Sequence, residues 1–215
     1  MNAKRIRALA LSGALVGWSF TAGIEQPWRR HPVVQAGLGT ALALAARAPL
    51  GLRPPPLYRG LRFGAAVASS VAVAVAAGTA STRVRSALAT HMGSDRTLPP
   101  RPARWLAVEI PLGTVWSEET AFRGALSTLA ADAFGARGGR LLQAVTFGLT
   151  HVPDARGTGE PVLATVAATG VAGWFFGLLA ERSGSLAAPM LAHLAINEAG
   201  ALGALAVRRF GGDSR

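Results

Sequence analysis

Three short polar motifs lie inside apolar stretches of this 215-residue chain, and their residue types could support hydrolysis. They span residues 118–123, 147–151 and 193–197, and they have the patterns E-E-x-x-x-R, F-x-x-x-H and H-x-x-x-N. Placing a charged group in hydrocarbon costs at least roughly 2.5–3.5 kcal/mol on insertion scales. Residues kept at such positions are therefore candidates for a chemical role.

The first motif offers a general base. Glu118 and Glu119 are adjacent on an expected helix and point about 100° apart, so they cannot face one cavity equally. Arg123 follows Glu119 by four residues and can form an ion pair with it along the helix. That pair would leave Glu118 as the freer carboxylate and the candidate base. A Glu–Arg bridge that only fixes helix packing is the alternative.

The other two motifs add groups that could bind water or stabilise an oxyanion. His151 and His193 could share a water molecule with Glu118, or bind a zinc ion together with it. Asn197 lies four residues after His193 on the same helix face, where an amide beside a histidine can stabilise an oxyanion. Phe147 would form a wall of the cavity. Ordinary packing is the alternative for each residue, and hydrolysis with or without zinc stays open at this point.

Apolar helices must position these motifs. The chain is 50% hydrophobic and only 15% charged, whereas a soluble domain usually carries about 25% charged residues. Most of its apolar runs approach the ~20 residues that span a bilayer. The runs are Ala8–Ile24, Val33–Leu52, Phe63–Ser81, Trp105–Ala131, Leu141–Val152, Pro161–Ala180 and Leu186–Val207. We therefore expect an all-α, polytopic transmembrane helix bundle of about seven spans, within a range of about six to eight.

A polar, proline-containing linker at Thr82–Arg104 divides the chain into two parts. We expect residues 1–104 to hold three transmembrane helices and this linker. Residues 105–215 should form a four-helix catalytic core with a conical cavity among its helices. At ~1.5 Å per residue, the alternating direction of the spans brings all three motifs to a similar depth in a layer ~30 Å thick.

Charge and cysteine content restrict the possible partners. The net charge is +11, and the basic residues lie mostly between the apolar runs, where they suit anionic lipid headgroups. No segment offers the basic face of a nucleic-acid-binding domain. The chain has no cysteine, which excludes disulfides, thiolate catalysis and cysteine metal sites.

The first apolar run comes after Lys4, Arg5 and Arg7, as in a secretory signal peptide, but no convincing signal-peptidase cleavage site follows it. We therefore expect an uncleaved first span. Its basic residues favour a cytoplasmic N-terminus and a site nearer the cytoplasm. The strong bias towards arginine and alanine is typical of a high-GC bacterial genome. We therefore expect a multi-pass protein of the bacterial plasma membrane.

The three motifs, in this order and each in an apolar run, resemble the CPBP family, the CAAX protease and bacteriocin-processing group also called ABI. The resemblance covers roughly residues 105–207. It implies an intramembrane endopeptidase of the glutamic type, with Glu118 activating water and His151 helping to hold it. By the same resemblance, His193 and Asn197 would form the oxyanion hole, while Glu119 and Arg123 would support the site.

Cofactor and substrate are less closely defined. The family was long classed as metalloproteases, so we expect either no metal or a Zn²⁺ ion held by Glu118, His151 and His193. The expected partners are membrane lipids and a membrane-associated peptide or protein substrate; a bacterial source argues against a prenylated CAAX substrate. Two other functions remain: a non-enzymatic bacteriocin-immunity or scaffold membrane protein that retains the motif cavity, and a small proton-coupled transporter, because Glu and His chains also relay protons.

Overall fold

A computed structural model describes the chain except residues 1, 22–27, 29–30, 81–99 and 212–215. The described residues form helices and connecting turns, with no strand among them, so the expected all-α class is confirmed. Most of the predicted linker, and the end of the first apolar run, lie outside the described residues. The helices are α1 (Ala3–Ser19), α2 (Pro32–Ala45), α3 (Pro56–Ala80), α5 (Pro102–Arg104), η2 (Trp105–Trp116), η3 (Glu119–Leu126), α6 (Ser127–Leu149), α7 (Val152–Thr158), α8 (Val162–Ser183) and α9 (Ala187–Gly211).

The first motif lies on an unusually wide helical stretch. η2 and η3 are π-type segments, in which hydrogen bonds reach one residue further than in an α-helix. Pro111 lies inside η2 and has no N–H to donate to an α-helical ladder. Single π-type turns occur frequently at functional sites, and here such turns surround the Glu118–Glu119 pair.

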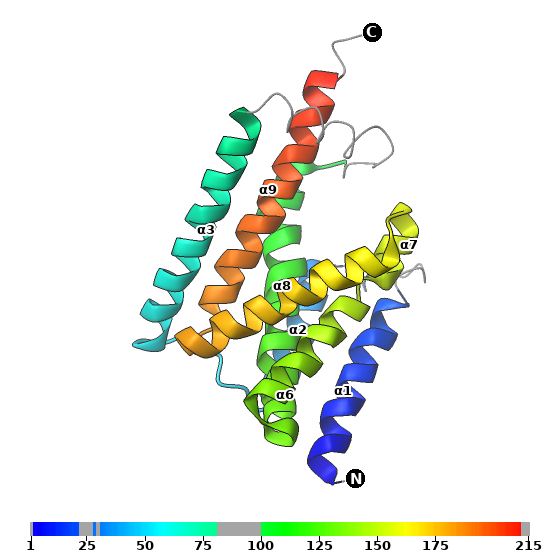
Figure 1. Ribbon diagram of the computed structural model, residues 1–215, viewed down its shortest axis with the longest axis vertical. Helices are drawn as coiled ribbons and strands as arrows, with labels where there is room; N and C mark the ends of the chain where they lie inside the picture. The colour runs from blue at the N-terminus through cyan, green and yellow to red at the C-terminus, as the bar shows by residue number, and fades with distance from the viewer. Residues whose placement is uncertain (1, 22–27, 29–30, 81–99, 212–215) are drawn as a thin grey trace.

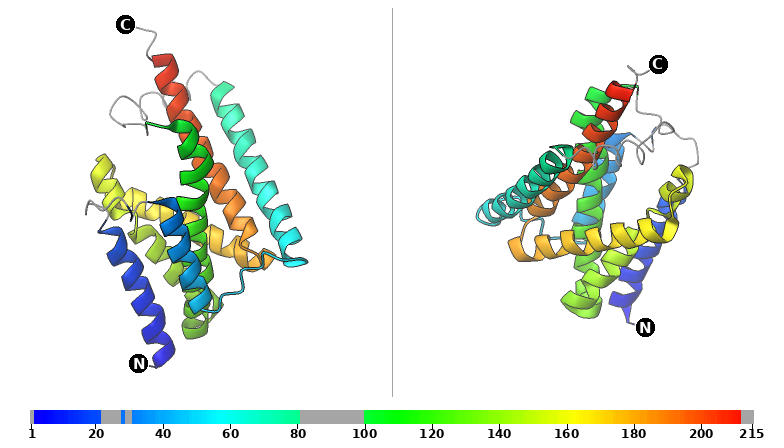
Figure 2. Two further views of the ribbon diagram at one scale, coloured as in Figure 1. Left: turned by 180° about the vertical axis from the view of Figure 1, so that it is seen from behind. Right: turned by 45° about the horizontal axis from the view of Figure 1, so that its top comes forward.

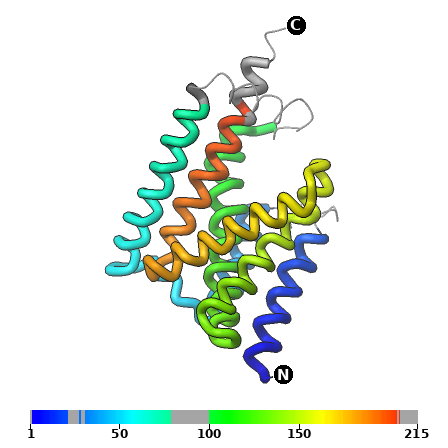
Figure 3. The backbone as a smooth tube through the Cα atoms, viewed as in Figure 1, coloured from blue at the N-terminus to red at the C-terminus, as the bar shows by residue number. Residues whose placement is uncertain are grey.

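A sharp reversal inside α6 brings the first two motifs together. Gly135 has φ 75° and ψ 168°, a conformation that glycine adopts without a steric penalty. The chain turns back in this light-green segment at the lower end of the molecule (Figure 3). A Cβ atom at Gly139 would lie 2.6 Å from the backbone nitrogen of Ala131, so the two arms of the reversal pack closely. The second arm of α6 therefore runs beside η3.

α8 runs beside the second arm of α6 and packs closely against it (Figure 1). A Cβ at Gly148 would lie 2.6 Å from the carbonyl oxygen of Val166, and a Cβ at Gly173 would lie 2.9 Å from Cδ1 of Phe147. Small residues allow helix backbones to approach in this way. The glycines of α8 thus have a packing role, and they bring α8 against the helix that carries the second motif.

Each N-terminal helix packs against a different C-terminal helix. α1 lies beside α6, α2 against η2 and η3, and α3 along α9 (Figure 2). Ser12 and Thr146 share a hydrogen bond of 2.7 Å between α1 and α6. Trp116 Nε1 donates to Thr40 Oγ1 at 2.9 Å, which joins η2 to α2. The three N-terminal helices make few contacts with one another in the described part of the chain, so they do not form a bundle of their own.

The segment between α2 and α3 secures the start of α9. The backbone N–H of Leu186 donates to the carbonyl oxygen of Leu50 at 2.9 Å. Gly51 lies so close to the carbonyl of Gly184 that a side chain would not fit. Ser185 Oγ accepts a hydrogen bond from the backbone N–H of Ala187 at 3.2 Å. These contacts fix the first turn of α9. The third motif lies further along the same helix.

The outward faces of several helices are apolar. Leu44, Val73, Leu163 and Val171 are 68%, 68%, 82% and 69% exposed. By length and composition, two of the described helical stretches could cross a membrane, Pro56–Gly78 and Val162–Ser183, while Pro32–Ala45 is a shorter apolar helix. Two such helices are weak support for a membrane bundle, and the expected number of about seven spans is not confirmed.

Candidate active site

Glu119 is the centre of a buried polar cluster. Its side chain has no exposed surface, and its Oε1 lies 3.2 Å from NH1 of Arg123 and 2.8 Å from Nδ1 of His193. The side chain of Arg123 is also completely buried. The expected pairing of Arg123 with Glu119 is therefore present. The contact between Glu119 and His193 was not predicted, because helical spacing does not relate side chains on η3 and α9.

His193 lies between two carboxylates. A Glu119 carboxylate ionised beside Arg123 can only accept hydrogen bonds, so His193 Nδ1 carries the hydrogen and donates it. The other ring nitrogen, Nε2, lies 3.8 Å from Oε2 of Glu118. That separation is too long for a direct hydrogen bond, but one water about 2.8 Å from both atoms would fit it. Glu119 thus sets the orientation in which His193 faces Glu118.

The two adjacent glutamates have different environments. The side chain of Glu118 is 29% exposed, whereas that of Glu119 is fully buried. Oε2 of Glu118 is itself buried and has no hydrogen-bond partner among the described residues. Oε2 of Glu119 is likewise buried without a hydrogen-bond partner among those residues, but Glu118 is the partly exposed one of the two and lies beside Nε2 of His193. Its role as the base stays a prediction.

His151 lies in the turn between α6 and α7, beyond the last helical residue of α6, Leu149. The apolar run predicted a helix as far as Val152, so the turn shortens that helix by a few residues. His151 Nδ1 lies 2.8 Å from the carbonyl oxygen of Phe147. A carbonyl only accepts, so Nδ1 carries the hydrogen and Nε2 of the neutral ring keeps a lone pair. That nitrogen can accept a hydrogen bond from water.

Phe147 connects the second motif with the buried cluster. Its ring centroid lies 4.8 Å from that of His151 and 6.2 Å from that of His193, both in edge-to-face arrangements. The guanidinium carbon of Arg123 lies 4.1 Å from the ring centroid of Phe147. The side chain is 2% exposed. Phe147 therefore packs between the two histidines and Arg123, in keeping with the expected wall position.

Phe176 on α8 is a component of the cluster that sequence reasoning missed. Its ring stacks on the His193 imidazole, with centroids 4.9 Å apart and an interplanar angle of 25°. The guanidinium carbon of Arg123 lies 5.0 Å from the same ring. The flanking Gly173 and Gly177 indicated close helix packing, but no spacing rule related Phe176 to His193.

Asn197 lies one helical turn after His193 on α9 and is half-buried. Its side-chain amide makes no hydrogen bond to another described residue. A turn of α-helix rises ~5.4 Å, so the Asn197 amide lies on the same side of α9 as the imidazole. Its role in an oxyanion hole stays a prediction.

The described side chains of this site do not form a set of metal ligands. Among the described residues, no three His, Asp or Glu side chains are placed to hold one metal ion, so Glu118, His151 and His193 do not form such a group here.

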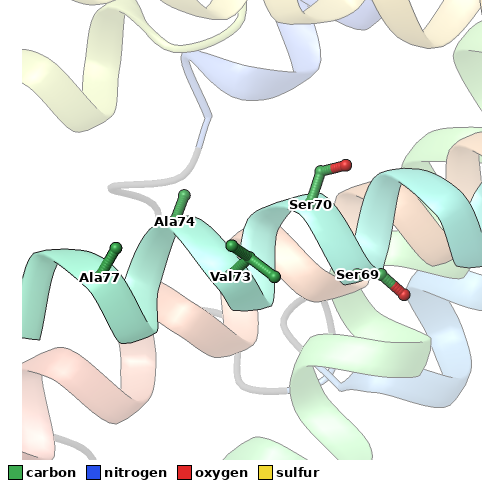
Figure 4. A pocket seen from close by; sticks show the side chains of 5 residues that line it. All are labelled: Ser69, Ser70, Val73, Ala74 and Ala77. Carbon is green, nitrogen blue, oxygen red and sulfur yellow. The ribbon is translucent and has the colours of Figure 1, made fainter.

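Two shallow hollows lie away from the polar cluster. One of about 410 Å³ follows α3 and is lined by Ser69, Ser70, Val73, Ala74 and Ala77 (Figure 4). The other, about 420 Å³, is formed by residues 50–56.

Comparison with known proteins supports the significance of this cluster. Residues 100–199 match the family described as type II CAAX prenyl endopeptidase Rce1-like. The likeness covers 100 of the 215 residues, in the C-terminal part of the chain. All three motifs fall inside the matched residues, so the resemblance to CAAX proteases is confirmed, and the domain supports a membrane-protease type of function. Searches of curated proteins and of solved structures found no match.

Proposed function

We propose that this Rce1-like protein is an intramembrane endopeptidase of the glutamic type that cleaves a membrane-associated protein or peptide. The observation that carries the proposal is the line formed by Arg123, Glu119, His193 and Glu118. In it, one carboxylate is buried and paired, the imidazole is oriented, and the second carboxylate has a free oxygen 3.8 Å from that imidazole.

Glu118 acts as the general base in this proposal. Its carboxylate accepts a proton from a bound water molecule, while Nε2 of His151 accepts the water's other hydrogen in a hydrogen bond. The water oxygen attacks the carbonyl carbon of the scissile peptide bond, and the carbonyl π electrons move to oxygen. Glu118 then passes its proton to the leaving nitrogen as the carbon–nitrogen bond breaks. One water is consumed, and a carboxylic acid and an amine are released.

His193 and Asn197 stabilise the oxyanion. His193 donates through Nε2–H, so it acts as an imidazolium whose Nδ1–H is already donated to Glu119. The cluster then contains two carboxylates, one guanidinium and one imidazolium, and their formal charges cancel. Arg123 forms an ion pair with Glu119, and Glu119 orients His193. Every step uses side chains of this chain.

Cleavage of a membrane proteome tests this function. Purified wild-type and Glu118→Gln proteins, each reconstituted in liposomes, are incubated with solubilised bacterial membrane proteins, and new peptide N-termini are labelled and identified. We expect new termini with the wild-type protein only, since glutamine keeps the shape of glutamate but cannot accept the proton. Equal termini from both proteins, or none from either, would contradict the proposal. Proton flux that depends on Glu118 would instead favour a transporter.

A further inference from the structure

Phe176 occupies a special place beside the polar cluster although it belongs to none of the three motifs. It is 2% exposed and lies on α8, while His193 lies on α9 and Arg123 on η3. Its ring centroid lies 4.9 Å from the centroid of the His193 imidazole and 5.0 Å from the guanidinium carbon of Arg123. One aromatic ring therefore touches the two side chains that bind Glu119.

The contact with Phe176 gives the His193 imidazole a second restraint beside its hydrogen bond to Glu119. The bond from Nδ1 to Glu119 restrains one edge of the imidazole, at 2.8 Å. Stacking at an interplanar angle of 25° restricts the plane of the ring. Both restraints act on the same ring, and they favour the orientation in which Nε2 lies 3.8 Å from Oε2 of Glu118.

We propose that Phe176 is a positioning residue, whose ring face holds the His193 imidazole so that Nε2 reaches the oxyanion. This inference rests on the proposed function, because it assigns Phe176 a part in that reaction. An aromatic face also attracts the cationic forms of His193 and Arg123. Phe147 does not replace this contact, since it meets His193 edge to face at the longer distance of 6.2 Å.

The neighbouring residue Phe175 provides a matched control. It is 37% exposed, and its ring centroid lies 6.4 Å from that of Phe176 in a tilted arrangement. Among the described residues, the rings of His193, Phe147 and Phe176 contact one another or Arg123, whereas the only ring contact of Phe175 is the one with Phe176. Replacing either phenylalanine by leucine removes the same atoms from the same helix, but only one replacement removes the stacked ring.

The test compares Phe176→Leu, Phe176→Tyr and Phe175→Leu on a peptide substrate identified by the cleavage experiment. We expect Phe176→Leu to lower kcat about 10- to 100-fold with little change in KM, because it misplaces a transition-state donor. Phe176→Tyr keeps the ring and should retain most of the activity, while Phe175→Leu should behave like wild type. Equal losses in Phe176→Leu and Phe175→Leu would overturn the proposal.

A double-variant comparison separates positioning from general packing. In a His193→Gln background there is no imidazole to position, so Phe176→Leu should cause little further loss of kcat. If Phe176 served only helix packing, the same fold-loss would appear in both backgrounds, and the proposal would be wrong.

A spectroscopic measurement keeps the contact testable without hydrolysis. In histidine-labelled protein, with the His193 signal assigned from His193→Gln, stacking shifts the imidazole C–H resonances upfield. Phe176→Leu should move them downfield, and Phe175→Leu should not. A wild-type protein that cleaves nothing contradicts the proposed function, whereas an unmoved His193 signal in Phe176→Leu contradicts the positioning itself.

Discussion

The N-terminal and C-terminal helices use the same secondary structure for different purposes. In the helices before residue 81, every described charged side chain is exposed. Their contacts with the rest of the molecule involve small and apolar side chains, a few hydroxyl groups and, at the surface, Lys4 beside Asp132 and Arg5 over the Phe134 ring. In the C-terminal helices, Glu119, Arg123 and His193 are buried against one another. Residues of the first region should therefore affect stability alone, while those of the second should affect stability and chemistry separately.

The sharpest test of this contrast is Glu118→Ala. We expect no measurable cleavage, because the proposed base is lost, and an unfolding temperature close to that of the wild type, because Glu118 is partly exposed and Glu119 keeps its partners. Glu109→Ala is the control, since Glu109 lies on the same helical stretch, is 40% exposed and pairs with Arg104 instead. Cleavage assays and thermal unfolding in detergent measure the two effects. Residual cleavage by Glu118→Ala would assign the base to another residue.

Arg123→Ala should instead damage the fold. The replacement leaves Glu119 as a buried carboxylate without its cation, which typically costs about 3–5 kcal/mol. We expect poor yield and a much lower unfolding temperature, compared with little change for Arg137→Ala at an exposed position. A stable, well-expressed but inactive Arg123→Ala protein would show that Arg123 serves chemistry more than structure.

Asn197→Ala should reduce cleavage and leave the fold intact. Losing one oxyanion donor typically costs 10²–10³-fold in kcat, about 2.7–4 kcal/mol. Trace activity should therefore remain, unlike in Glu118→Ala. Ile196→Ala, at a 43% exposed neighbouring position, is the control. Wild-type kcat in Asn197→Ala would remove this residue from the oxyanion hole.

In the N-terminal region, Gly39→Val should lower stability alone. A Cβ at Gly39 would lie 2.5 Å from the Ser117 carbonyl oxygen and from Thr120 Oγ1, so α2 must move away from Ser117 and η3. Overpacking of this kind typically costs about 1–3 kcal/mol. Gly37→Val is the matched control on the same helix, because nothing lies within 4 Å of a Cβ at Gly37. Equal unfolding temperatures for the two variants would contradict the close approach of α2.

The smallest effect is expected from metal removal. Since the proposed steps need only side chains, treatment with a chelator should leave the cleavage rate close to its starting value. Elemental analysis of the purified protein accompanies this assay. Stoichiometric zinc, lost together with activity and restored with it, would instead show a zinc protease and a different role for His193.

The sequence predicted the all-α class because long apolar runs of about the length of a membrane span indicate helices directly. It also predicted the Arg123–Glu119 pair, since the four-residue spacing places both side chains on one helix face. The approach of Glu119 to His193 and the stacking of Phe176 depend on how η3, α8 and α9 are rotated about their axes. Sequence spacing on one helix contains no information about that rotation. The reversal at Gly135 lies in the break expected between the apolar runs Trp105–Ala131 and Leu141–Val152, so the change of direction was predicted, although the residue that makes it was not.

The separate attachment of the N-terminal helices also has a consequence for synthesis of the protein. α1, α2 and α3 leave the ribosome before any of their packing partners exists, and α3 must wait for α9, the last helix of the described chain. About 107 residues separate the end of α3 from the start of α9, which corresponds to about 5–20 s of elongation. In the folded chain, Gly60 and Gly64 of α3 lie against the start of α9. During that interval, this face of α3 has no native neighbour. The order of the helices thus sets a period of exposure in which another membrane helix or a chaperone could contact the nascent chain.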